Sequence, residues 1–445
     1  MVSTIAPTNT HTTMDDADAE QWEAEYEQSP CAPACAPPTD TSPYPNPPAT
    51  PSTTFPSIPP PSAPFPERAT HVVPAAWGRC TPAVPVPDLG GKGRRKERVR
   101  EVAEELVGMK ERWGRGEGGG GAGAGAGDER VLWLCVNRYA PARGEGRGVT
   151  LFFAHAIGFP KEIWEPTIAR LLAHTRGRVD IAEIWCIESV QNGDSALLND
   201  GNLGGLYDWQ DHARDILAFL TAYLPASPSS TSSSLPTFLP RVPAPLSAHR
   251  AQHGYTSRTL VAIGHSFGGC TTALAATARP ALFSALVLVD PVIIPHGCYP
   301  PRTVRGLVRG ALARREGWRS RAEARRVLDR SPFFAAWDPE ALGVYVECGL
   351  VAQEGAGAGV RLKTSGVQEA ILFTDTRVPA ETFERLAALP ARVALHWVMP
   401  GRPAELGRRE MGERCWRRRA NAGNVVVERA SHLVGVLVFF VLGAR

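Results

Sequence analysis

The chain has 445 residues, in which 48 Lys and Arg against 45 Asp and Glu give a formal net charge of +3. This balance excludes a dedicated nucleic-acid-binding protein and a polybasic membrane protein, because both carry a large excess of positive charge. The nine cysteines are odd in number and scattered, which favours a reduced chain, and we therefore expect a cytoplasmic protein. The longest aliphatic run, residues 433–442, is too short to span a bilayer, so stable membrane insertion is not expected.

The first 130 residues are expected to differ from the rest of the chain. Residues 1–90 are rich in Pro, Ser and Thr and show no lasting hydrophobic period. Such a segment cannot bury enough apolar surface to offset the entropy of ordering, so we predict that it is disordered. Residues 91–130 are predicted to hold an amphipathic helix over 93–113, followed by a flexible Gly/Ala linker at 118–127.

Residues 131–445 are predicted to form one domain, in which short apolar segments alternate with segments of helical periodicity. Strands are predicted at 131–139, 149–154, 181–187, 259–264, 284–290, 393–398 and 425–428, and helices at 161–173, 209–223 and 271–278. This alternation predicts an α/β fold, a mostly parallel sheet with helices on both faces. Two excursions interrupt it. A Ser/Pro insertion at about 225–257 is expected on the surface, and a strand-free, helical segment at about 295–366 is predicted to cap an active site.

The most specific motif is Gly264-His265-Ser266-Phe267-Gly268, which lies between a predicted strand and a predicted helix. This is the nucleophile-elbow pattern, a turn so tight that only Gly fits at the flanking positions and the Ser is held in a strained backbone conformation. The helix that follows directs the positive end of its dipole at the site. We therefore predict that Ser266 is a catalytic nucleophile.

A serine hydroxyl is a weak nucleophile and needs a base. Three histidines follow Ser266 in the sequence, namely His296, His396 and His432. His432 comes just after the last predicted strand, where a loop can place its imidazole over the elbow, and it is the predicted base. We expect His396 to be packed within its strand and His296 to be structural.

The acid of the triad has two candidates. Asp290 ends a predicted strand, at the carboxyl edge of the sheet where active sites of open α/β sheets form. A carboxylate buried there needs a partner, which a protonated imidazole would supply. We favour Asp290, and Glu405, which follows the next core strand, is the alternative.

An oxyanion hole would complete the site. The backbone N–H of Phe267, directly after the nucleophile, is one predicted donor, and the N–H of Ile157, in the loop after an earlier strand, is the other. His155 is expected to brace that loop. The sequence contains nothing like a phosphate-binding loop or a dinucleotide fingerprint, and we expect neither a cofactor nor a metal.

Several further motifs share one resemblance. They are His155-Ala-Ile-Gly-Phe-Pro-Lys-Glu162, Gln191-Asn-Gly-Asp-Ser195, Trp209-x-Asp211-His-Ala-Arg214-Asp215 and Leu286-Val-Leu-Val-Asp-Pro-Val-Ile293. Together with the elbow they resemble a fungal α/β-hydrolase family that includes toxin-biosynthesis hydrolases and peroxisomal lipase-like enzymes. The resemblance covers residue 131 to the C-terminus. It implies an α/β-hydrolase fold with a helical cap, no cofactor, and catalytic roles for Ser266 and His432, with Asp290 where the family carries Asp or Glu. It also implies a peroxisomal location as an alternative, although Gly443-Ala-Arg445 does not match the C-terminal peroxisomal address.

These features predict a serine hydrolase that cleaves an ester or thioester of an apolar or secondary-metabolite small molecule through an acyl-enzyme. A serine at the elbow, where an epoxide hydrolase or dehalogenase would need Asp, argues against those two classes. Two alternatives stay open: an acyltransferase that uses the same triad, and a non-catalytic binding protein on a decayed hydrolase fold.

Overall fold

The computed structural model describes residues 67–90, 95–117, 131–140, 148–228, 235–353, 355, 358–402, 408–428 and 430–432. The predicted disorder of residues 1–66 and the predicted linker at 118–127 lie outside this part of the chain. The predicted amphipathic helix is present as α2 (Arg95–Gly114), and its apolar residues Val102 and Leu106 are buried.

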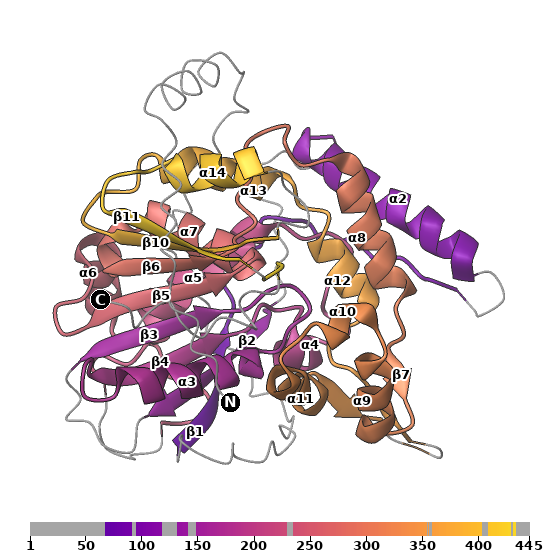
Figure 1. Ribbon diagram of the computed structural model, residues 1–445, viewed down its shortest axis with the longest axis horizontal. Coiled ribbons are helices and arrows are strands. Elements are labelled where there is room, and N and C mark those ends of the chain that lie inside the picture. The colour runs from indigo at the N-terminus through magenta and orange to yellow at the C-terminus, as the bar shows by residue number, and fades with distance from the viewer. Residues whose placement is uncertain are drawn as a thin grey trace.

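An eight-stranded sheet forms the centre of the molecule (Figure 1). Its strands, in spatial order, are β1 (Glu67–Pro74), β2 (Trp133–Ala140), β4 (Ile181–Ile187), β3 (Val149–Ala154), β5 (Thr259–His265), β6 (Ala285–Val289), β10 (Ala394–Pro400) and β11 (Ala422–Val427). The pairs from β4 to β11 are parallel, whereas β2 pairs antiparallel with both β4 and β1. The predicted mostly parallel sheet is therefore confirmed.

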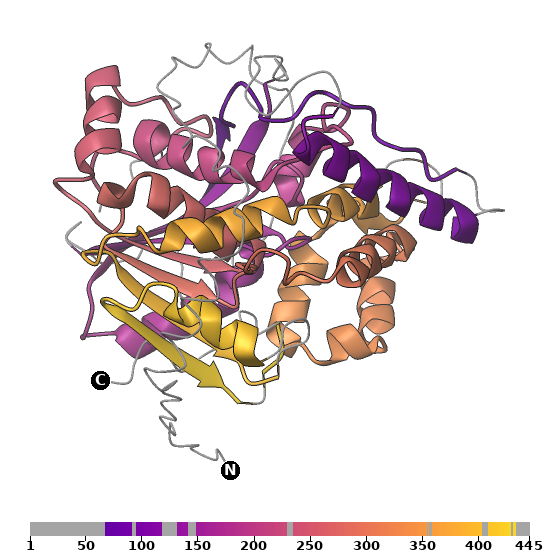
Figure 2. The same cartoon turned by 90° about the horizontal axis from the view of Figure 1, so that it is seen from above.

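Helices cover both faces of this sheet (Figure 2), which explains why its central strands are mostly apolar. In β3 the side chains of Phe152 and Ala154 enter one hydrophobic layer, together with residues of the helices α5, α7 and α13. Leu151 and Phe153 enter the opposite layer, with residues of α3 and of the cap. Alternate residues of one strand thus belong to two different cores.

The helices of the described residues have the following bounds. They are α3 (Glu165–Thr175), α4 (Gly193–Leu198), α5 (Trp209–Ala218), α6 (Ala244–His253), α7 (Phe267–Ala278), α8 (Pro301–Ala313), α9 (Arg321–Asp329), α10 (Pro332–Ala335), α11 (Pro339–Cys348), α12 (Gly366–Leu372), α13 (Arg377–Leu386) and α14 (Arg408–Trp416). Short 3-10 segments are η2 (Lys161–Trp164) and η4 (Pro280–Leu282), and α5 continues into a π-helical turn, η3 (Phe219–Tyr223). Within the described ranges, no helix is both long and apolar enough to cross a membrane.

The segment that was predicted to form a helical cap is mainly helical, but it is not free of strands. Helices α8 to α12 stand at one side of the sheet, and α2 lies along α8 (Figures 1 and 2). Between these helices, β7 (Gly317–Trp318), β9 (Val360–Leu362) and β8 (Leu350–Ala352) form a small antiparallel sheet. Strands of two or three residues are too short to show an alternating pattern, so the sequence gives no sign of them.

The predicted boundary of the disordered lead at residue 90 is wrong. Strand β1 pairs along its whole length with β2, from Glu67 opposite Ala140 to Pro74 opposite Trp133. Its short apolar stretch lies beside prolines and a histidine, and His71 is itself buried. Pairing with a distant strand, and not local pattern, orders this segment.

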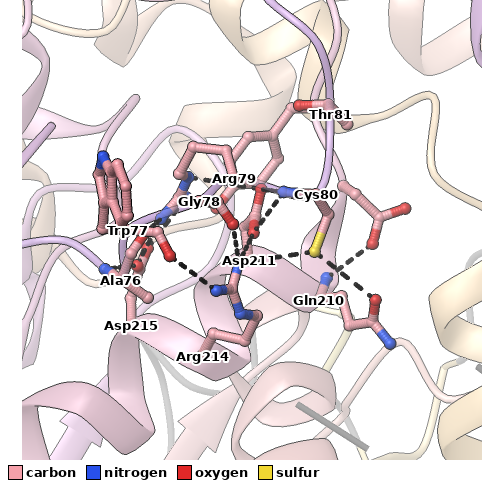
Figure 3. A network of polar contacts seen from close by, with 12 residues as sticks. Ala76, Trp77, Gly78, Arg79, Cys80, Thr81, Gln210, Asp211, Arg214 and Asp215 are labelled. Atoms are coloured by element: carbon pink, nitrogen blue, oxygen red, sulfur yellow. Dashed lines mark hydrogen bonds and ion pairs between the residues drawn. The ribbon is translucent and has the colours of Figure 1, made fainter. Parts of the chain in front are cut away.

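Polar contacts fix the chain after β1 to helix α5, as Figure 3 shows. The guanidinium of Arg79 pairs with Asp215 at 2.6 Å, and the backbone N–H of Cys80 donates to the carboxylate of Asp211 at 3.0 Å. Arg214 donates to the backbone carbonyls of Trp77 and Gly78. These α5 residues belong to the motif quoted above, and their partners lie in the segment that was predicted to be disordered.

The predicted Ser/Pro insertion is partly ordered, because it contains α6. The buried side chain of Arg250 in this helix donates to the carbonyl of Leu224 at 2.7 Å. Residues 229–234 lie outside the described part of the chain.

Candidate active site

The elbow is built at the junction of β5 and α7. Ser266 has φ 55° and ψ −118°, a conformation that non-glycine residues rarely adopt. A Cβ on Gly264 would lie 2.6 Å from the backbone oxygen of Gly268, and a Cβ on Gly268 would lie 2.5 Å from the carbonyl oxygens of Ala154 and His155. The two glycines are therefore required by the close approach of backbones.

Three residues distant in sequence meet at this turn. The hydroxyl of Ser266 donates to Nε2 of His432 at 2.8 Å, and Nδ1 of His432 donates to Oδ2 of Asp290 at 2.6 Å. Asp290 follows directly after β6, with φ 34°, and His432 follows β11. The parallel strands bring all three to the carboxyl edge of the sheet. The structure thus places the predicted nucleophile, base and acid in one hydrogen-bonded chain.

The environment keeps Asp290 ionised. Burial alone would raise its pKa, but the facing His432 and Arg414 outweigh burial and lower the pKa to about 2. Arg414, on α14, donates from Nη2 to Oδ1 of Asp290 at 3.0 Å. The two carboxylate oxygens therefore have separate partners. Nothing in the local sequence pattern indicates this role for Arg414.

A second histidine supports the loop that carries His432. The Nε2 of His265 donates to the backbone carbonyl of His432 at 2.8 Å, and the two rings lie 5.3 Å apart. Burial lowers the pKa of His265 to about 3, so its ring is neutral near pH 7. Sequence reasoning assigned His265 no role beyond its place in the elbow.

The loop predicted to complete an oxyanion hole lies beside the elbow. The N–H of Gly268 donates to the carbonyl of His155 at 3.1 Å, which joins the start of α7 to this loop. Phe267 is the first residue of α7, so its N–H has no partner within the helix. The N–H of Ile157 donates no hydrogen bond to any residue that the structure describes. Both predicted donors are thus available for an oxyanion.

His155 connects this loop to the end of β4. Its Nε2 accepts from the N–H of Ser189 at 3.1 Å, and its Nδ1 donates to the carbonyl of Ala156 at 2.7 Å. Burial lowers the pKa of His155 to about 4, which keeps the ring neutral. The predicted bracing role of His155 is confirmed by these contacts.

The other predicted candidates lie apart from the triad. His296 is exposed just before α8. His396 is also exposed, on β10, so the expectation that it is packed within its strand is wrong. The strand lies near the edge of the sheet, where only one face is covered at this position. Glu405, the alternative acid, lies outside the described residues.

A buried cluster of charges supports the far end of the same loop. The ammonium group of Lys161 lies 2.7 Å from Asp194 and 2.9 Å from Glu162, and the backbone N–H of Lys161 donates to Glu188 at 3.0 Å. Burial raises the pKa of Glu188 to about 7, whereas Lys161 and Lys363 hold the pKa of Asp194 far below its usual range. Lys161 and Glu162 belong to one of the motifs quoted above and Asp194 to another, and their contacts support the loop. No local sequence pattern predicts these contacts.

Trp337 and Tyr345 of the cap pack with Phe159 beside the site, and we call these three residues the aromatic wall. Phe159, at the end of the loop, packs edge to face against Trp337 at 5.0 Å and lies 6.3 Å from Tyr345. On its other side Phe159 lies 6.2 Å from His265. The cap therefore contacts the elbow through one aromatic ring.

A cavity of about 550 Å³ opens elsewhere, between the segment at 83–86, α4 and α12. Arg361, Lys363 and Gln368 are among the residues that line it. Ser266, Asp290 and His432 do not line this cavity, so the hydrogen-bonded chain, and not this cavity, locates the candidate active site.

Comparison with known proteins agrees with the fold. The profile of the Alpha/beta hydrolase family matches residues 151–437, which is more than half of the chain. The chain therefore belongs to the alpha/beta hydrolase family, which places it among hydrolases. Its α/β-hydrolase fold with a mostly parallel sheet is the fold of this family.

Two groups of relatives are similar to particular parts of the chain. The type I acyl-CoA thioesterase mpaH of Penicillium roqueforti (strain FM164) is 29% identical over 221 residues, which cover 47% of this chain and 42% of that protein. The peroxisomal membrane protein LPX1 of Saccharomyces cerevisiae (strain ATCC 204508 / S288c) is 32% identical over 147 residues, which cover 33% and 31%. The matched regions thus span less than half of these relatives. Among solved structures, the peroxisomal alpha-beta-hydrolase Lpx1 of S. cerevisiae superposes with a TM-score of 0.58 at 19% identity, over 83% of this chain and 84% of that one.

Proposed function

We propose that this protein is a serine hydrolase that cleaves an ester or thioester of a small molecule with an apolar acyl group. The observation that carries the proposal is the continuous hydrogen-bonded chain from Ser266 through His432 to Asp290, at a strained elbow. A decayed, non-catalytic site has no reason to retain this backbone conformation, which costs of order 1–3 kcal/mol.

The mechanism follows from the order of these contacts. His432 accepts the proton of the Ser266 hydroxyl as the oxygen attacks the substrate carbonyl. The N–H groups of Phe267 and Ile157 stabilise the negative charge on the carbonyl oxygen. Asp290 stabilises the imidazolium, which then protonates the leaving alcohol or thiol. Water, deprotonated by His432, releases the acyl group and restores Ser266.

Two observations support the substrate class. The buried aromatic rings of Phe159, Trp337 and Tyr345 make the surroundings of the elbow apolar on the side of the cap, which supports an apolar acyl group. The curated name of the Penicillium relative is that of an acyl-CoA thioesterase, which supports thioesters as candidates. The yeast relative is named as peroxisomal, which supports a peroxisomal location as the alternative to the predicted cytoplasmic one.

Steady-state hydrolysis of matched substrates tests the proposal. We expect the wild-type protein to hydrolyse p-nitrophenyl esters and N-acetylcysteamine thioesters of the same acyl chain, and Ser266→Ala to lose activity by about 1,000-fold or more. The exposed change His396→Gln is the matched control and should retain activity. A wild-type protein that is inert on every acyl chain, or an undiminished Ser266→Ala, would contradict the proposal. Acylation of an added alcohol with no release of free acid would favour the acyltransferase.

A further inference from the structure

Asp290 is held by a charged group that the triad does not need. Its Oδ2 accepts from His432, while its Oδ1 accepts from Nη2 of Arg414. The guanidinium and the imidazole therefore lie on opposite sides of one carboxylate. The negative charge of Asp290 is thus shared between the guanidinium of Arg414 and the imidazole of His432.

Arg414 is fixed as firmly as the carboxylate. Its side chain is 3% exposed, and its Nη1 donates to the carbonyl of Pro291 at 2.6 Å. This second bond fixes the turn that directly follows Asp290. The same turn contacts the elbow, because the N–H of Val292 donates to the carbonyl of Ser266 at 3.1 Å. One side chain of α14 thus orients both the acid and the backbone next to the nucleophile.

The charged and titratable groups around this pair are few among the described residues. His265 ends β5 and Ser266 follows it, and α14 supplies Arg414 and the buried thiol of Cys415. Buried Glu413 precedes Arg414 on α14. His265 is neutral near pH 7, because burial keeps its pKa near 3. Among the residues that the structure describes, Arg414 is therefore the cation that contacts Asp290.

We propose that Arg414 is a positioning residue for the acid–base pair, which fixes the orientation of Asp290 and keeps His432 in its neutral form down to lower pH. A cation that shares the carboxylate reduces the stabilisation that Asp290 gives to an imidazolium. His432 then remains able to accept the proton of Ser266 in mildly acidic solution. This inference rests on the proposed catalytic role of Ser266 and His432.

The rate at which a fluorophosphonate probe labels Ser266, measured from pH 5 to 9, tests the inference. Labelling needs a neutral base, so the rate falls in acid with the protonation of that base. In Arg414→Met the cation is lost, and we expect the midpoint of this fall to move up by about one pH unit. A residue with a merely structural role would lower the rate at all pH values and leave the midpoint in place.

Two further variants keep the result interpretable. Arg417→Met is the matched control, since Arg417 directly follows α14 and pairs with Glu384 at 2.8 Å; its midpoint should equal that of the wild type. Arg414→Lys keeps the charge but cannot donate to Asp290 and Pro291 at once, so its rate should fall about tenfold at an unchanged midpoint. If Arg414→Met does not fold, the labelling rate of Arg414→Lys still tests the role of Arg414.

The possible failures are distinguishable. A wild-type protein that takes no label overturns the proposed function as a whole. A wild type that labels, with Arg414→Met at the wild-type midpoint or Arg414→Lys at the full wild-type rate, overturns the role of Arg414 alone.

Discussion

His265 is not part of the Ser266–His432–Asp290 chain, but the site depends on it. Its ring links the elbow to the loop of His432 through one buried hydrogen bond. A buried carbonyl that loses its donor keeps the cost of desolvation without the compensation of the bond. The position of His432 over Ser266 therefore depends on the residue directly before the nucleophile.

Replacing His265 by Phe should keep the packing of the ring and remove the bond to His432. We expect the rate of ester hydrolysis to fall by roughly 3- to 10-fold, because a bond of this kind contributes about 0.5–1.5 kcal/mol. The measurement is kcat/KM for one short ester, with His396→Gln as the control. Wild-type kcat/KM in the His265→Phe variant would show that the bond does not position His432.

Buried neutral histidines also predict how stability depends on pH. The pKa values of His155 and His265 are lowered by burial to about 4 and about 3, from 6.5 in the unfolded chain. The unfolded state therefore binds more protons, and stability is complete above pH 6.5 and is lost as the pH falls toward 4. Each histidine contributes a slope of about 1.4 kcal/mol per pH unit in that window.

Urea unfolding at pH 7, 6 and 5 measures this slope. We expect His265→Phe to reduce the loss of stability between pH 7 and pH 5 by about 2 kcal/mol relative to the wild type. The exposed His396→Gln should leave it almost unchanged. Equal slopes in wild type and His265→Phe would mean that His265 titrates freely in the folded protein.

Some residues of the site could be predicted from the sequence and others could not, because only some of them depend on a local pattern. Ser266 could be predicted because a tight turn demands glycines at fixed spacing, and His432 and Asp290 because each lies just after a predicted strand. The roles of Arg414 and His265 could not be predicted, because their partners are chosen by contacts across the sheet. Arg414 lies in an arginine-rich stretch, and nothing in its own neighbourhood distinguishes it from the other arginines there.

At the scale of elements, the central strands could be predicted from their local pattern, whereas β1 could not. The central strands are buried on both faces, so their residues are mostly apolar, and their positions were predicted within a few residues. Strand β1 and the segment after it are ordered by pairing with β2 and by ion pairs with α5. Composition alone made this segment look like the rest of the proline-rich lead.

The ion pair of Arg79 with Asp215 should therefore contribute strongly to stability. Both side chains are buried, and Arg79→Met leaves the carboxylate of Asp215 without its cation (Figure 3). We expect the free energy of unfolding to fall by about 3–5 kcal/mol, measured by urea denaturation.

Arg115→Met is the matched control for this change. It breaks the exposed pair with Glu117 and should leave the free energy of unfolding almost unchanged, because water and salt screen an exposed pair. A loss of less than 1 kcal/mol in Arg79→Met would contradict the importance of the network in Figure 3.

At the scale of the whole molecule, the described part of the chain combines the eight-stranded sheet with the helices of the cap, and part of the proline-rich lead is built into that sheet as β1. Two truncations separate these parts. A chain that starts at residue 67 keeps β1 and Arg79, and we expect its melting temperature to equal that of the full chain. A chain that starts at residue 91 loses both, and we expect its melting temperature to fall by about 10 °C or more. Equal melting temperatures for the two would contradict the role of β1.

The central claim is that Ser266 is an activated nucleophile, and mass spectrometry of the protein after reaction with a fluorophosphonate tests it most directly. We predict one adduct per chain, which peptide mapping assigns to Ser266. The adduct should be absent in Ser266→Ala and should form far more slowly in His432→Gln. A folded wild-type protein without an adduct, or a Ser266→Ala variant that still takes the label, would contradict the account.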